Sequence, residues 1–215
     1  MGFCKTPTKT KKGFKGKNIF PSIETTVIRP SFADYFIPSP KPKKPVIAIH
    51  TRDPRDTMKI IKAFYLKNPQ FKWVSFKDMR NMKREEFAEA LGESCLSVWL
   101  DRTGGFGTFP LESMLCNTPV VGTLPILKPD WLTNENGLWV NDESKVVEMV
   151  GNYMKNWLED SVPENLYSKM KDSVKDYTLD NERNGIINFF NSLLDERKTE
   201  FNNSINKLTP VGVNS

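Results

Sequence analysis

Residues 101–122 constrain the fold more than any other stretch, because they join a glycine-rich loop to a short helical segment and an apolar strand. The apolar residues 96–100 before them are typical of a buried parallel strand. The loop holds three glycines, Gly104, Gly105 and Gly107. Pro110 suits the first turn of a helix, and Asn117 is placed to end it. A glycine loop that opens onto a helix N-terminus offers free N–H groups and a positive dipole end, so the stretch predicts an anion site suited to a diphosphate.

Segments typical of strands and helices alternate along the rest of the chain. Short apolar or alternating runs predict strands at residues 23–28, 46–50, 71–76, 96–100 and 119–122. Helical patterns begin at Asp53 as N-cap, with Pro54 at the first position, and recur at residues 83–91, 143–158, 163–177 and 181–203. Alternation at these short intervals predicts a single three-layer α/β domain with a parallel sheet and helices on both faces.

The positive charge of the chain is concentrated at its N-terminus. The formal net charge is +5, and six lysines precede the first acidic residue, Glu24. Residues 1–22 contain little to bury, so we expect a basic flexible arm, or a strap onto an acidic partner. We expect the folded domain at residues 23–203 and a tail at residues 204–215.

Composition excludes several classes of protein. The sequence is 38% hydrophobic and 27% charged, and no apolar run is long enough to cross a bilayer. Its three cysteines, Cys4, Cys95 and Cys116, have no metal-binding spacing, so we expect free thiols in a reducing cytoplasm. We expect no bound metal and no cofactor. The tryptophans do not recur at an interval suited to stacking, so we expect them to be core or packing residues: Trp73, Trp99, Trp131, Trp139 and Trp157.

The central stretch resembles the signature of the group 1 retaining glycosyltransferases, in their nucleotide-sugar-binding C-terminal half. The resemblance rests on Gly105-Phe106-Gly107, on Glu112 within Pro-Leu-Glu, and on the Asn-Thr-Pro-Val-Val-Gly run that follows. It implies a Rossmann-like domain, the C-terminal half of a GT-B fold, and a nucleoside diphosphate sugar as donor substrate. Chain order matches this family over roughly residues 23–197.

The resemblance also implies roles for individual residues. Backbone N–H groups of the loop would bind the donor phosphates, and Glu112 would accept hydrogen bonds from the ribose hydroxyls. The loop residues concerned are Gly105, Phe106, Gly107 and Thr108. In the family another glutamate lies at the loop and helps to hold the donor sugar, but Gly104 occupies that position here.

Basic residues after the first predicted central strand allow two interpretations. In the resembled family an arginine and a lysine there clamp the donor diphosphate, and Arg52, Arg55 and Lys59 are the candidates by position. The alternative is a solvated basic helix face. His50, the single histidine, ends the same strand, and we favour a local structural hydrogen bond over a role as proton carrier.

Two functions of different classes remain open on the sequence. One is the donor-binding half of a retaining glycosyltransferase, which needs a second domain, a partner subunit or self-association to complete its cleft. The other is a non-catalytic derivative that serves as a binding or structural component. The absence of a glutamate at Gly104 favours the second, and Glu112 with its intact loop favours the first.

Overall fold

The computed structural model describes residues 2–4, 25–101, 103 and 105–208 of the 215-residue chain. Most of the predicted basic arm, the domain boundary predicted at residue 23, and Gly104 therefore lie outside the described residues. The chain divides into two units, one formed by residues 32–175 and the other by residues 1–31 and 176–215.

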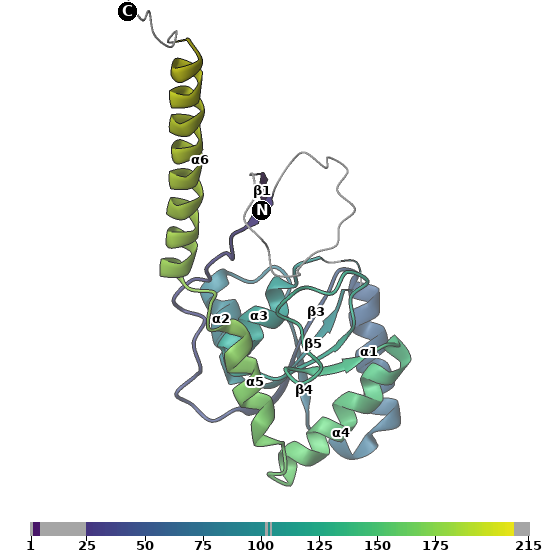
Figure 1. Cartoon of the computed structure of the whole chain (residues 1–215). Coiled ribbons are helices and arrows are strands. Elements are labelled where there is room, and N and C mark those ends of the chain that lie inside the picture. Colours follow the sequence, from purple (N-terminus) through teal and green to yellow (C-terminus); the bar gives the residue numbers. More distant parts are fainter. Residues whose placement is uncertain (1, 5–24, 102, 104, 209–215) are drawn as a thin grey trace, which may run out of the picture. The chain divides into compact units, whose positions relative to one another are not determined.

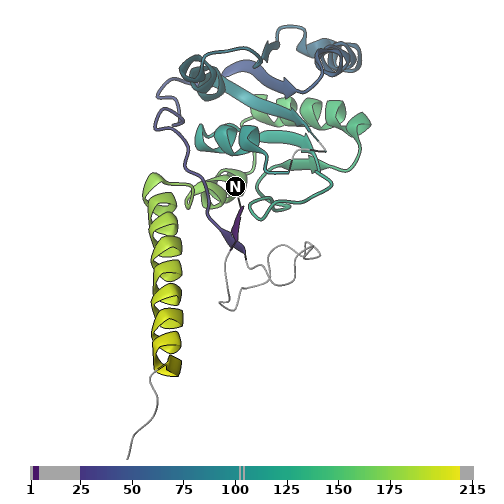
Figure 2. The ribbon, with the colours of Figure 1, turned by 90° about the horizontal axis from the view of Figure 1, so that it is seen from above.

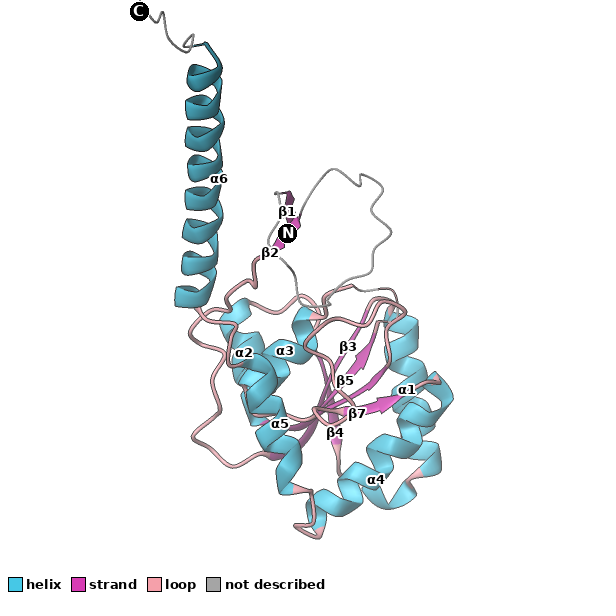
Figure 3. Cartoon of the chain, in the orientation of Figure 1, coloured by secondary structure: helices cyan, strands magenta, loops and turns pink. Residues whose placement is uncertain are grey.

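The unit of residues 32–175 is built on a five-stranded sheet in which every pairing is parallel (Figure 3). Its strands are β3 (Lys44–Thr51), β4 (Ser75–Asp78), β5 (Ser94–Leu100), β6 (Val120–Thr123) and β7 (Leu138–Val140). Their order across the sheet is β4-β3-β5-β6-β7. The predicted α/β class with a parallel sheet is confirmed.

Helices cover both faces of this sheet. In Figure 1, α1 and α4 lie to the right of the sheet and α2, α3 and α5 to its left, and Figure 2 shows the same unit from above. Their bounds are α1 (Pro54–Lys67), α2 (Arg84–Glu93), α3 (Thr108–Leu115), α4 (Val146–Leu158) and α5 (Glu164–Val174), with short 3-10 helices η1 (Pro69–Phe71) and η2 (Glu143–Lys145). Because both faces are covered, β3 buries Ile47, Ala48 and Ile49 completely, which explains its continuous apolar run.

Helix α1 begins as predicted, with Asp53 as N-cap. The Asp53 carboxylate accepts a hydrogen bond from the Arg55 backbone N–H at 2.8 Å, and Pro54 occupies the first helical position. Phe64 is buried in the core, but Met58, which is also apolar, is 64% exposed. The buried side of α1 therefore excludes the Met58 position.

The strand predicted at residues 71–76 is displaced toward the C-terminus. Phe71 ends the 3-10 helix η1, and the Val74 N–H donates to the Phe71 carbonyl at 3.0 Å in a turn. The strand itself is Ser75–Asp78. Phe71 and Val74 are buried while Trp73 is 49% exposed, so a turn produced the alternation that suggested a strand. Trp73 packs edge to face on Phe71, with ring centroids 6.2 Å apart, and is therefore a packing residue at the edge of the core.

The second unit contains a two-stranded sheet and a long helix. Strand β2 (Thr25–Val27) pairs antiparallel with β1 (Gly2–Cys4), so the strand predicted at residues 23–28 belongs to a separate sheet. Helix α6, Leu179–Leu208, has 30 residues and extends past the predicted range of 181–203. Within the described parts of the chain, neither this helix nor any other combines the length and apolar character needed to cross a membrane.

Candidate functional site

The carboxyl ends of the parallel strands place the predicted donor-binding residues at one edge of the sheet. Strand β3 ends at Thr51, directly before Arg52, and β5 ends at Leu100, directly before the glycine loop. These two strands are hydrogen-bonded neighbours, with Thr51 opposite Leu100. Ligands of open α/β sheets bind at this edge, so the fold brings the loop and Arg52 to the expected side.

Gly107 gives the loop a conformation that a side chain would not allow. Its φ is +73°, in the left-handed region, and it serves as the N-cap of α3 without a side-chain capping bond. A Cβ atom at Gly107 would lie 2.9 Å from Trp131 Cζ2 and 3.3 Å from the Trp99 ring. Helix α3 therefore begins at Thr108 without a capping side chain, and its N-terminus retains the character of an anion site.

Three tryptophans support the loop from within the core. The ring centroids of Trp99, Trp131 and Trp139 are 6.1–6.5 Å apart, and Trp99 and Trp131 are almost completely buried. Trp131 Nε1 donates to the Phe106 carbonyl at 2.7 Å. Trp99 and Trp131 are core residues, which agrees with the prediction of core or packing positions, but their contact with the glycine loop was not predicted.

Glu112 is a buried carboxylate on α3. It is 4% exposed, and its Oε1 accepts a hydrogen bond from Arg84 Nη2 at 2.5 Å in an ion pair. The Arg84 guanidinium lies over the rings of Phe36 and Phe87, at 4.9 and 5.3 Å from their centroids. Burial raises the pKa of Glu112, and Arg84 opposes that shift only in part. The site thus keeps a carboxylate in surroundings that disfavour its charge.

Sequence analysis missed Arg84, which lies 28 residues before Glu112. One local signal was present. Arg84 is the first residue of α2, where the helix dipole favours acidic side chains, and Glu85 and Glu86 follow it. A cation is unfavourable at that position, and the ion pair with Glu112 offsets this cost.

Each candidate residue of the phosphate clamp pairs with a nearby carboxylate. Arg52 Nε donates to Asp101 Oδ2 at 2.9 Å, which links the loops after β3 and β5. Arg55 pairs with its own cap, Asp53, at 2.6 Å, and Lys59 pairs with Asp56 at 2.9 Å. The Arg55 guanidinium lowers the pKa of Asp53 to about 2. Of these three basic residues, Arg52 forms an ion pair with Asp101, at the start of the glycine loop.

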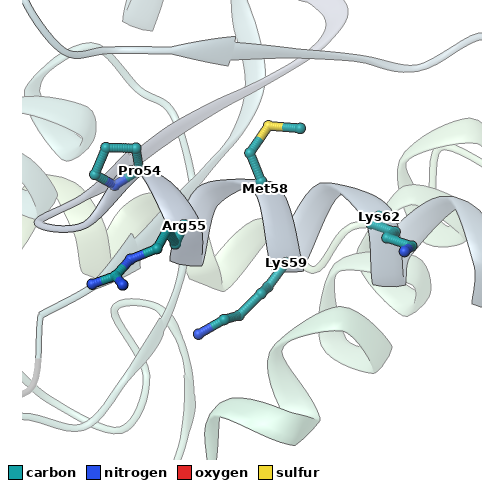
Figure 4. A pocket seen from close by; sticks show the side chains of 5 residues that line it. All are labelled: Pro54, Arg55, Met58, Lys59 and Lys62. Atoms are coloured by element: carbon teal, nitrogen blue, oxygen red, sulfur yellow. The ribbon is translucent and has the colours of Figure 1, made fainter.

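Arg55 and Lys59 lie along a basic depression on the outer side of α1 (Figure 4). Its lining residues all come from this helix and are Pro54, Arg55, Met58, Lys59 and Lys62. The depression starts next to the carboxyl end of β3 and is open to solvent. The structure therefore leaves both interpretations of these residues, a phosphate clamp and a solvated basic face.

His50 packs against α3. Its ring stacks on Phe109 with centroids 5.2 Å apart, and Phe109 in turn contacts Phe87 edge to face at 6.0 Å. Its Nδ1 atom is buried without a hydrogen-bond partner, so the prediction of a structural hydrogen bond is wrong for this atom. Burial is the main reason why the pKa of His50 is lowered.

The remaining titratable groups do not form a metal site in the described part of the chain. No group of three or more histidine, cysteine, aspartate or glutamate side chains is placed there to hold a metal ion. Cys95 and Cys116 are free and buried, and burial raises the pKa of each thiol to about 12.

Comparison by sequence finds no family model and no curated protein that matches this chain. Comparison by structure finds similar folds. The chain matches TarM with a TM-score of 0.55 at 15% identity over 74% of its length. It matches a chain of the GtfA/B complex with a TM-score of 0.54 at 14% identity over 77%. A pneumococcal O-GlcNAc transferase, GtfA, solved with UDP and GlcNAc, gives 0.51 at 9% identity over 78%.

These neighbours are GT-B glycosyltransferases. The α/β unit has a GT-B Rossmann-like fold. The match spans 38% of TarM, 39% of the GtfA/B chain and 38% of the pneumococcal enzyme, so it corresponds to part of each of these proteins. At these identities the likeness concerns the fold and assigns no role to any side chain.

Proposed function

We propose that this chain is the donor-binding half of a retaining glycosyltransferase and binds a nucleoside diphosphate sugar at the carboxyl edge of its sheet. The observation that carries the proposal is the burial of the Glu112 carboxylate. Glu112 is 4% exposed and lies on α3, the helix that follows the glycine loop. A buried charge lowers stability unless it is compensated, and Arg84 compensates it only in part. A ligand that needs an acceptor at this point would account for the arrangement.

In this proposal the loop and α3 bind adjacent parts of the donor, its phosphates and its ribose. The N–H groups of Gly105, Phe106, Gly107 and Thr108 bind the phosphates at the positive end of the α3 dipole. Arg84 donates to Oε1 of Glu112. In the proposal the other oxygen, Oε2, accepts hydrogen bonds from the ribose hydroxyls. Arg52, with Arg55 and Lys59 beside it, stabilises the diphosphate as it leaves.

Transfer needs more than this edge of the sheet. The acceptor hydroxyl, the anomeric carbon and the leaving diphosphate must be held together away from bulk water. One α/β unit supplies one wall of such a cleft. We therefore propose that a second domain, a partner subunit or a second copy of the chain supplies the other wall.

The proposal is tested by calorimetric titration of the full chain with UDP, GDP and ADP, with the corresponding monophosphates and with the sugar conjugates of the diphosphates. We expect one nucleotide to bind, with the diphosphate tighter than the monophosphate. Glu112→Gln should weaken that binding about 10- to 100-fold, because a charge-assisted hydrogen bond is lost. Glu159→Gln, at the exposed end of α4, is the matched control and should bind like the wild type.

The same titration distinguishes the donor-binding function from the second candidate, a non-catalytic derivative. Gly104 replaces the family's glutamate, which favours a domain that retains the fold but not the ligand. If the wild type binds none of these nucleotides, the donor site is refuted and the derivative becomes the better description.

A further inference from the structure

Helix α6 carries an apolar face along its length. Six large apolar side chains on this helix are 40–65% exposed, namely Leu179, Ile186, Ile187, Phe190, Leu194 and Phe201. At 3.6 residues per turn these six positions fall within about 100° of one another around the helix axis. We call these six residues the apolar face of α6.

A different side of α6 packs against the chain itself. Glu182 Oε2 accepts hydrogen bonds from the Ser31 N–H at 2.9 Å and from the Ser31 hydroxyl at 2.5 Å. Gly185 lies so close to Ile28 that an added Cβ would be 3.1 Å from Ile28 Cγ2, and Phe189 is 7% exposed. The spacing of Glu182, Gly185 and Phe189 puts them on one side of the helix, outside the arc of the apolar face.

The packed side ends well before the helix does. Among residues 190–204 the structure shows no fully buried side chain, and Phe201 is 65% exposed. An isolated helical segment of this length is only marginally stable in water. An exposed apolar face on such a segment indicates a contact that stabilises both the helix and the face.

The spacing of the apolar face fits another helix as partner. Ile187, Leu194 and Phe201 are seven residues apart, and Phe190 lies between the first two, as in the heptad pattern of packed helices. Helix α6 contains five acidic and four basic residues. Anionic lipid surfaces attract helices with a strongly basic polar side, so this near-balanced charge favours a protein partner.

We propose that α6 is the surface through which two copies of this chain associate, apolar face against apolar face. Balanced charge allows the helix to face its own copy without net repulsion, as a symmetric contact requires. At about 100 Å² for each partly exposed side chain, two facing copies would bury roughly 1,200 Å², the lower bound of specific interfaces.

The test is sedimentation velocity of the full chain at micromolar concentrations. We expect the wild type to be dimeric. The double variant Leu194→Glu and Phe201→Glu should weaken association at least about 100-fold, because each lost apolar contact accounts for a factor of ten or more. The control adds the same two charges to another side of the helix through Asn188→Glu and Asn203→Glu, and it should remain dimeric.

Two further measurements separate loss of association from loss of folding. All five tryptophans lie in residues 32–175, so unchanged tryptophan emission in the double variant shows an intact α/β unit. Under mild oxidation Leu194→Cys should form a disulfide-linked dimer, and Asn188→Cys should not. A monomeric wild type overturns the proposal. Association that survives the double variant, or a monomer that binds anionic phospholipid vesicles, overturns it as well.

Discussion

Gly107 and Gly105 lie two residues apart in one loop but differ in what an added side chain would meet. At Gly107 the φ of +73° is unfavourable for alanine, and an added Cβ would lie 2.9 Å from Trp131 Cζ2. An added Cβ at Gly105 would have no atom within 4 Å outside its chain neighbours. We expect Gly107→Ala to lower the free energy of unfolding by about 1–3 kcal/mol, the cost of holding a non-glycine residue in this region. Gly105→Ala should change it by less than about 0.5 kcal/mol. Urea denaturation of both variants measures the difference, and equal effects would show that the loop is not held against the tryptophans.

The buried carboxylate of Glu112 makes a prediction about pH and stability. Burial raises its pKa above the value in the unfolded chain, so its contribution to stability is present below the unfolded value and is lost as pH rises through the folded one. Glutamine has no such loss. We therefore expect the melting temperature of Glu112→Gln to gain on that of the wild type between about pH 4 and pH 7. A difference that shrinks over this range would mean that the Arg84 ion pair outweighs the burial.

For individual residues, the loop could be predicted from the sequence, but the side chains that surround it could not. Gly107 could be selected because glycine allows loop conformations that other residues do not, and Glu112 because its position matches the motif of the resembled family. Arg84 and Trp131 could not, because each reaches the site through tertiary packing from 28 and 25 residues away, respectively.

The junction between α3 and β6 depends on a lysine from the segment before β3. Lys43 Nζ donates to the Cys116 carbonyl at 2.9 Å and to Thr118 Oγ1 at 2.6 Å, next to the end of α3. A cation is favourable at a helix C-terminus, but burial lowers the pKa of Lys43 from 10.5 to about 8. The charged lysine is therefore held at some cost near neutral pH.

This lowered pKa predicts the direction of a pH effect. The contribution of Lys43 is present above the unfolded pKa of 10.5 and is lost as pH falls through about 8. We expect the melting temperature of the wild type to rise relative to that of Lys43→Met between pH 8 and pH 10. Thermal melts at three pH values measure the trend, and a flat or falling difference contradicts it. Lys44→Met, which removes an exposed ion pair with Glu93, controls for loss of a neighbouring lysine.

Secondary-structure elements were predicted best where burial alone decides them. Strands β3, β5 and β6 are covered on both faces, so their apolar runs are continuous and unambiguous. Strand β4 lies at the sheet edge and has no fully buried residue. Its sequence carries a weaker signal than the turn before it, in which Phe71 and Val74 are buried, and this is why the prediction was displaced.

For the whole molecule, we expect the 215-residue chain alone to release nucleotide from a donor slowly and to transfer no sugar. In the proposed function the α/β unit provides one wall of a cleft, so water would reach a donor bound there. A donor panel scored for free nucleotide and for transfer to added glycans measures both outcomes. Multiple-turnover transfer by the monomer would show that a second wall is not needed.

The order of the strands also has a consequence for how the chain is made. Strand β3 is the first strand of the sheet to be synthesised, yet Ile47 pairs with Phe76 on one side and with Leu96 on the other. At ribosomal speeds of roughly 5–20 residues per second, β3 stays without its second neighbour for seconds. Charges and prolines beside such a strand suppress aggregation, and residues 41–45 read Lys-Pro-Lys-Lys-Pro. We therefore expect this segment to limit aggregation of the nascent chain during the interval in which β3 has nothing to pair with.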